Sequence, residues 1–199
     1  TNRIRVASRV PAGSREFESL TITNPTAYFV HVLREVLLDR GIAVTGRTLD
    51  IDELVETPAY DGDSFRRIAR HTSPPLSDIV QVINKRSQNL YAEQVLKTLG
   101  AVLPDTVSGA PEGSARMGWD AAMRTFAAAS VDTSRIQLTD GSGLSKQNLV
   151  TADMIGSLLA YMWHHPDDST RSAFLNSLPI GGVDGSLSGR FRTGSARGN

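Results

Sequence analysis

Hydrophobic and polar positions alternate over the first residues of the chain. Ile4 and Val6 alternate with arginines, residues 11–14 (Pro-Ala-Gly-Ser) have the composition of a turn, and residues 16–23 form a second extended run. Period-two alternation on either side of a turn is typical of paired strands. The simplest interpretation of residues 1–23 is a β-hairpin.

The pattern then changes to a helical period. Asn24 stands where an N-cap is expected, Pro25 occupies the first helical position, and Gly41 lies just past the end. Apolar residues recur between them at helical spacing and predict one buried stripe, formed by Val30, Leu33, Val36 and Leu37. Residues 42–60 are expected to be extended, with a short strand before Thr57.

From residue 64 onward the pattern predicts mainly helices. They are expected over 64–71, from about Leu76 to Lys85, from Leu90 to Leu99, over 114–129, from Thr151 to a point before Pro166, and over 168–177. We expect Ile79, Val82 and Ile83 to be buried. We also expect Gly100 to be a C-cap, and Ser114 and Thr151 to be N-caps. Residues 185–199 have the composition of a flexible loop.

Composition excludes several function classes. The 21 basic residues balance 21 acidic ones, so no net charge favours nucleic acid or an anionic membrane. The absence of cysteine excludes disulfides and thiolate chemistry. No apolar run is long enough for a transmembrane segment, and the first residues are not a signal peptide. The His164-His165 pair has no third ligand at a metal-like spacing, so neither a metal nor a cofactor is expected.

Two short segments carry candidate chemistry. Ser87-Gln88-Asn89 interrupts two predicted helices and, taken as three letters alone, is best explained as a turn, because Ser and Asn favour caps. Asp140-Gly141-Ser142-Gly143 is explained equally simply as a tight turn. This segment lacks the alternating acids of a calcium loop, and its serine does not lie in a nucleophile elbow.

The context of both segments resembles the peptidase S13 family of penicillin-binding D-alanyl-D-alanine carboxypeptidases and endopeptidases. Residues 73–80 and 84–93 resemble the family's middle active-site motif, Ser-x-Asn, and the segment that leads into it. Residues 140–145 and 178–187 resemble later family segments, and residues 24–46 an earlier one. The similarity therefore covers most of the chain, in family order.

Two further family motifs do not occur in their usual form. The nucleophile motif Ser-x-x-Lys cannot be built, because the only lysines are Lys85, Lys97 and Lys146, and none follows a serine at that spacing. Arg192-Thr193-Gly194 is similar to the closing motif Lys-Thr-Gly. In the family an arginine-rich stretch precedes that motif, so we expect the true Lys-Thr-Gly to follow Asn199.

The resemblance implies acyl transfer on peptidoglycan stem peptides that end in D-Ala-D-Ala, and acylation by β-lactams. Ser87 would relay a proton and Asn89 would orient the substrate, so these two are the candidate catalytic residues. Lys85 and residues 140–143 (Asp140, Gly141, Ser142, Gly143) are candidates for substrate binding or support of the site. The chain by itself, without the nucleophile, is expected to be inactive. The family also implies a periplasmic or otherwise extracytoplasmic location.

The implied fold class is α+β. Residues 61–199 would be a helix-rich part of a transpeptidase-like catalytic domain, and residues 1–60 the tail of an inserted β-containing domain with a connecting helix. Another segment or chain would complete the sheet, because a sheet that lacks strands has an exposed edge. Two alternatives stay open at this point. One is a non-catalytic homologue that binds peptidoglycan or a partner, and the other is a related serine esterase or β-lactamase.

Overall fold

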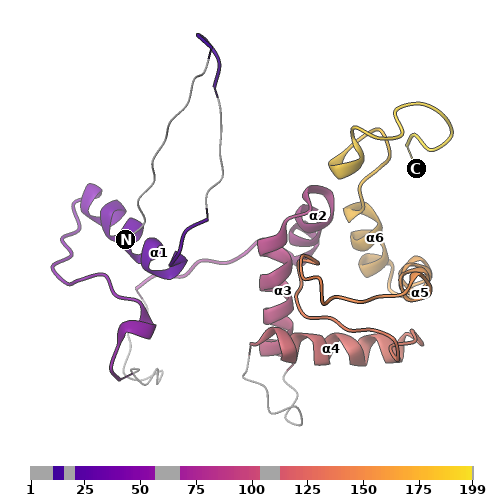
Figure 1. Cartoon of the computed structure of the whole chain (residues 1–199), viewed down its shortest axis with the longest axis horizontal. Helices are drawn as coiled ribbons and strands as arrows, with labels where there is room; N and C mark the ends of the chain where they lie inside the picture. The colour runs from indigo at the N-terminus through magenta and orange to yellow at the C-terminus, as the bar shows by residue number, and fades with distance from the viewer. Residues whose placement is uncertain (1–10, 16–20, 57–67, 104–112, 199) are drawn as a thin grey trace. The chain divides into compact units, whose positions relative to one another are not determined.

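The computed structural model describes residues 11–15, 21–56, 68–103 and 113–198. The chain forms two units, Thr1–Arg70 and His71–Asn199 (Figure 1). In the first unit, α1 spans Pro25–Asp39, and the Asn24 side chain accepts a hydrogen bond from the Ala27 N–H at 2.9 Å. The predicted N-cap is therefore confirmed.

Two other predictions for the first unit are wrong. No residue of α1 is buried, and Leu33 and Val36 are 44% and 48% exposed. The helix is amphipathic, as its periodicity indicates, but an apolar stripe is buried only where another surface packs against it. The described residues of this unit provide no such surface. In place of a strand before Thr57, Ile51–Glu53 forms the 3₁₀ turn η1, because local carbonyls accept the available N–H groups. The predicted hairpin strands lie mostly outside the described residues.

The second unit consists mainly of helices in its described part. They are α2 (Leu76–Arg86), α3 (Asn89–Val102), α4 (Ala115–Ala128), α5 (Ala152–Trp163), α6 (Asp168–Ser177) and the 3₁₀ turn η2 (Gly185–Leu187). Side chains of Ser114, Thr151 and Asp167 accept N–H groups of the first turns of α4, α5 and α6. The helix predicted over 64–71 is absent from its described residues, 68–71, where the chain remains irregular up to the two prolines that precede α2.

The helices pack in two pairs, α3 with α4 and α2 with α6, while α5 contacts α6 (Figure 1). The α3–α4 contact contains buried Leu96, Met117 and Ala121. Gly100 lies inside α3 at this contact, so its predicted role as a C-cap is wrong. A Cβ atom at Gly100 would lie 2.8 Å from both the Gly118 nitrogen and the Ser114 oxygen, so glycine allows the two backbones to approach closely.

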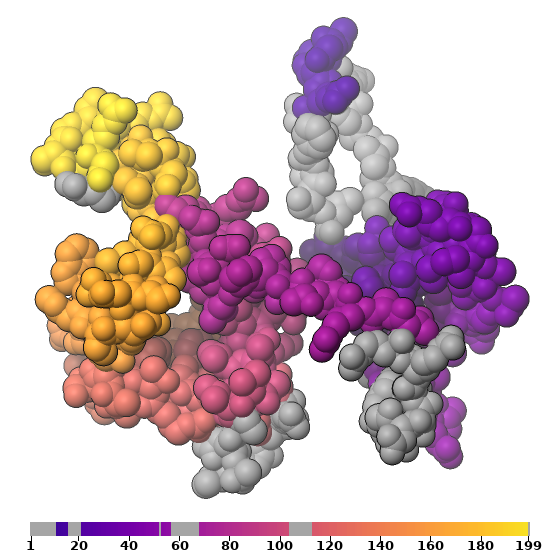
Figure 2. Space-filling model, turned by 180° about the vertical axis from the view of Figure 1, so that it is seen from behind, coloured from indigo at the N-terminus to yellow at the C-terminus, as the bar shows by residue number. Residues whose placement is uncertain are grey.

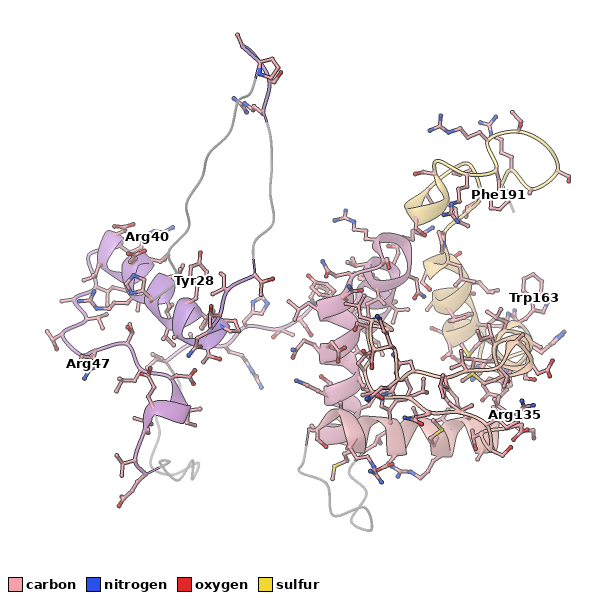
Figure 3. The ribbon with its side chains drawn as sticks, viewed as in Figure 1. Tyr28, Arg40, Arg47, Arg135, Trp163 and Phe191 are labelled. Carbon is pink, nitrogen blue, oxygen red and sulfur yellow. The ribbon has the colours of Figure 1, made fainter. Side chains whose placement is uncertain are left out.

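Burial elsewhere is lighter than the pattern suggests. The α2 residues predicted to be buried (Ile79, Val82 and Ile83) are only partly covered. Trp163 is 62% and Phe191 is 53% exposed, and both extend from the ribbon of the second unit (Figure 3). The described part of this unit therefore presents large apolar side chains that nothing within it covers.

The described residues contain no β-strand, and their one isolated β-bridge pairs Gln137 with Leu149. This helix-rich architecture agrees with the predicted helical part of an α+β domain. The loop predicted over 185–199 is, in its described part, a series of hydrogen-bonded turns, with the Gly198 N–H donating to the Gly181 carbonyl at 2.9 Å. Within the described ranges, no helix has both the length and the apolar character to cross a membrane.

Candidate active site

The turn between α2 and α3 presents Ser87 in an uncommon backbone conformation. Ser87 ends α2 with φ 53° and ψ 52°, and the Gln88 N–H donates to the Ile83 carbonyl at 3.1 Å. Asn89 then begins α3. This left-handed conformation costs a non-glycine residue about 1–2 kcal/mol, so a serine here gives up stability that glycine would retain. Such an outlier makes the Ser87 hydroxyl a candidate functional group.

Residues 140–148 form a loop organised by one carboxylate. Asp140 Oδ1 accepts the Gly143 N–H at 2.7 Å and the Asn148 side-chain amide at 2.9 Å, while its Oδ2 accepts the Ser145 N–H at 2.6 Å. These hydrogen bonds, that from Asn148 with the largest effect, hold the pKa of Asp140 below its ordinary value. The ionised carboxylate therefore braces the loop.

The same loop lies against the first turns of α3. A Cβ atom on Gly141 would be 2.7 Å from the Ala92 carbonyl oxygen, which leaves room only for glycine. The next residue, Ser142, donates its N–H to Glu93 Oε1 at 3.1 Å. These contacts bring the two candidate segments of the sequence, nearly fifty residues apart, to the same place.

A small open pocket of ≈ 220 Å³ lies where the segments meet. It is lined by Ile83, Asn84, Ser87, Gln88, Asn89, Ala92, Gly141, Ser142 and Ser186. The polar groups in this set are hydroxyls and carboxamides, which can donate and accept hydrogen bonds but do not ionise near neutral pH. The pocket can thus orient a polar ligand and relay a proton, but its lining contains no side chain that could act as a general base near neutral pH.

Not every predicted site residue lines this pocket. Ser87, Asn89, Gly141 and Ser142 do, whereas Asp140 and Gly143 belong to the bracing loop behind it. Lys85 is also outside the lining, because its Nζ donates to Asp184 Oδ2 and to the Leu178 carbonyl. The residues 192–194 that are similar to Lys-Thr-Gly are exposed and do not line it either.

Several residues of this region were not singled out from the sequence. Asn84 Nδ2 donates to the fully buried Ser177 Oγ at 2.7 Å and so ties α2 to α6. Asp184 accepts the Ile180 N–H at 2.8 Å, and hydrogen bonds from Lys85 and then Ile180 hold the pKa of Asp184 below its ordinary value. Ser186 lines the pocket. All lie within or near segments that resemble the family, but the Asn84–Ser177 and Lys85–Asp184 contacts join residues that are 93 and 99 positions apart in sequence.

A second hollow, of ≈ 850 Å³, lies between α2 and α3 on a different set of residues. It is lined mainly by apolar side chains such as Leu76, Val82, Val95 and Val102. The lining also contains His71, Ser73 and Asp78, but no hydrogen bond or ion pair joins these three, and Asp78 instead accepts from the Ser77 hydroxyl. This hollow is therefore better suited to packing than to chemistry. Among the described residues, no group of three or more His, Cys, Asp or Glu side chains is placed to hold a metal ion.

With this geometry in place, comparison with known proteins defines the class. The sequence profile of the D-Ala-D-Ala carboxypeptidase 3 (S13) family matches residues 1–199, and the chain belongs to this family. The resemblance noted from the motifs is confirmed.

The names of individual relatives agree with this family assignment. The chain is 35% identical over 208 residues to a D-alanyl-D-alanine carboxypeptidase of Actinomadura sp. (strain R39), a match that covers 100% of this chain and 35% of the relative. It is 27% identical to the D-alanyl-D-alanine carboxypeptidase DacB of Haemophilus influenzae, with 86% of this chain and 33% of the relative covered. The chain therefore spans about a third of the length of these relatives.

The fold is similar to that of a solved structure. A crystal structure of penicillin binding protein 4 (dacB) from Haemophilus influenzae, complexed with a β-lactam, superimposes with a TM-score of 0.73. The match has 24% sequence identity and covers 90% of this chain and 38% of the other. The helix-rich architecture is thus similar to the fold of part of that protein.

Proposed function

We propose that the protein that contains this chain is a serine-type D-Ala-D-Ala carboxypeptidase or endopeptidase. It would act on peptidoglycan stem peptides through an acyl-enzyme and would be acylated by β-lactams, which resemble the D-Ala-D-Ala amide. A covalent intermediate divides a difficult hydrolysis into two easier steps. The relatives' names, D-alanyl-D-alanine carboxypeptidase among them, support this substrate class.

The observation that carries the proposal is the joint position of Ser87 and Asn89 on one pocket with Ser142. Ser87 would pass a proton to the departing D-alanine, a task for which a hydroxyl that both donates and accepts is suited. Asn89 would hold the substrate backbone or the nucleophilic lysine in place through its amide. Gly141 and the loop braced by Asp140 would form the wall behind them.

The nucleophile would come from a Ser-x-x-Lys motif outside these 199 residues. The lining supports this division of roles, because it contains hydroxyls and carboxamides but no group that ionises near neutral pH. The exposed apolar residues of the second unit, including Leu76 at 61% and Val102 at 68%, support a further proposal. Another segment or chain would cover them and complete the catalytic domain and its sheet.

The remaining assignments follow from the same function. We propose that residues 61–199 belong to the catalytic domain and residues 1–60 to the tail of an inserted domain. A protein that acts on peptidoglycan would work outside the cytoplasm, in the periplasm or an equivalent compartment.

A fluorescent penicillin tests the function directly. The full-length gene product should be labelled covalently, and unlabelled penicillin should compete. Ser87→Ala and Asn89→Ala should each slow labelling by about 10²-fold or more, because a relay or orienting group contributes on that order. Ser157→Ala, which changes an exposed serine on α5, is the matched control and should be labelled like the parent protein.

The outcomes separate the alternatives. Absence of labelling from the folded full-length protein would contradict a peptidase and favour a non-catalytic binding homologue. Labelling followed by rapid hydrolysis of penicillin, with no release of D-alanine from a D-Ala-D-Ala peptide, would favour a β-lactamase.

A further inference from the structure

A charged pair ties the last turn of α2 to the segment that follows α6. Lys85 Nζ donates to Asp184 Oδ2 at 2.5 Å and to the Leu178 carbonyl at 3.0 Å. The Lys85 side chain is 17% exposed and that of Asp184 is 36% exposed. Removal of either partner would leave the other charge without its counter-ion, so the contact between the two segments depends on both side chains.

Asp184 also organises its own turn. Its second oxygen, Oδ1, accepts the Ile180 N–H at 2.8 Å, so one carboxylate closes the 180–184 turn and fixes that turn to α2. Gly185 follows with φ +56°, and a Cβ atom there would lie 2.8 Å from the Lys85 carbonyl oxygen. The backbone of the turn therefore lies directly against the backbone of α2 at Lys85. Figure 2 shows the C-terminal segment, in yellow, against α2, in magenta.

Each residue of the ion pair is followed, two positions further along the chain, by a serine that lines the pocket. Ser87 follows Lys85 by two positions, Ser186 follows Asp184 by two, and both serines line the pocket. We propose that Lys85 and Asp184 are positioning residues, whose ion pair sets the distance between the Ser87 and Ser186 hydroxyls across the pocket. This inference rests on the proposed function, because acyl transfer is the reaction that the spacing would serve.

The position of Ser87 depends on contacts that its neighbouring residues make with other segments. Its left-handed backbone is one that a serine does not favour, so neighbouring contacts must hold it. The Asn84–Ser177 hydrogen bond fixes α2 to α6 but does not reach the turn that contains Ser186. The Lys85–Asp184 pair does reach it. A misplacement of about 1 Å at a reacting group can slow a reaction by about 10²-fold, so a small shift of either serine is measurable.

The test uses the full-length protein and measures two quantities at a saturating concentration of fluorescent penicillin. These are the rate constant of acylation and the fraction of protein finally labelled. Lys85→Met and Asp184→Asn should lower the rate constant at least about tenfold while most molecules still become labelled. Lys85→Arg keeps the charge and should recover part of the rate. Lys97→Met, at an exposed lysine of α3, should behave like the parent protein.

A purely structural role for the pair would give a different result. It would lower the melting temperature and the labelled fraction, while the molecules that still react would do so at the parental rate. That result, or a parental rate in Lys85→Met and Asp184→Asn, would overturn the positioning inference and leave the proposed function intact.

Hydrogen exchange tests the pair without reference to activity. In Lys85→Met, peptides that cover residues 84–89 and 178–187 should exchange faster than in the parent, because the contact between them is lost. Unchanged exchange in both peptides would refute the inference. Failure of the parent protein to react with penicillin refutes the proposed function instead, so the two failures are distinguishable.

Discussion

The contact between α3 and α4 allows a prediction with a definite sign and size. At this contact a Cβ atom on Gly118 would lie 2.9 Å from the Leu96 carbonyl carbon and closer still to its oxygen. Ordinary contacts begin at 3.4 Å and the carbonyl oxygen is the nearer atom, so Gly118→Ala requires the helices to separate by more than about 1 Å. The obstacle is backbone, which cannot rotate away as a side chain can.

The expected loss in the free energy of unfolding is the difference between two opposing effects of the substitution. Overpacking of this kind costs up to about 3 kcal/mol, and alanine recovers about 1 kcal/mol because glycine is a poor helix former. The net loss for Gly118→Ala is therefore about 2 kcal/mol, which lowers the melting temperature by roughly 4–8 °C in a chain of this size. Gly156→Ala is the matched control, since Gly156 is exposed in α5 and its Cβ would have nothing within 4 Å. This substitution should raise stability by about 1 kcal/mol.

Thermal unfolding of the parent and both variants, followed by circular dichroism at 222 nm, measures the two shifts. We expect the melting temperature to fall in Gly118→Ala and to rise in Gly156→Ala. If Gly118→Ala melts at or above the parental temperature, the close packing of α3 on α4 is wrong.

Three further predictions concern the pocket. Ser87→Gly should raise the free energy of unfolding in urea by about 1 kcal/mol, because glycine tolerates positive φ, while penicillin labelling slows by about 10²-fold or more, as in Ser87→Ala. Gly141→Ala should slow labelling at least about tenfold, because a Cβ atom 2.7 Å from the Ala92 carbonyl oxygen pushes Ser142 away, and an unchanged rate would contradict this. Asp140 has a lowered pKa when folded, so its contribution to stability is present above about pH 4 and is lost as the pH falls through the folded value. Melting temperatures measured against pH should therefore fall less steeply below pH 4 in Asp140→Asn than in the parent.

Local features of the fold were predictable from the sequence where they depend on neighbouring residues. The N-caps at Asn24, Ser114 and Thr151 are confirmed, because each side chain needs only an N–H group three positions away. The Ser87–Asn89 turn between two helices is confirmed for the same reason. Sequence context and resemblance were both needed to connect this turn with the loop at residue 140.

Features that depend on distant residues were missed or misjudged. Gly100 has the usual character of a helix end, but its function is to admit another helix, which only the packing of α4 reveals. Lys85 could not be assigned a partner, because Asp184 lies 99 residues further along the chain. The stripe of α1 has the spacing of a buried face, yet spacing alone does not supply the surface that would bury it.

The most direct test of the account is a crystal structure of the full-length protein acylated by a β-lactam. The account predicts that the adduct occupies the pocket beside Ser87 and Ser142, with the Asn89 side-chain amide within hydrogen-bond distance of the ligand. An acylated serine whose ligand lies away from this pocket, with Ser87 and Asn89 facing solvent, would contradict it.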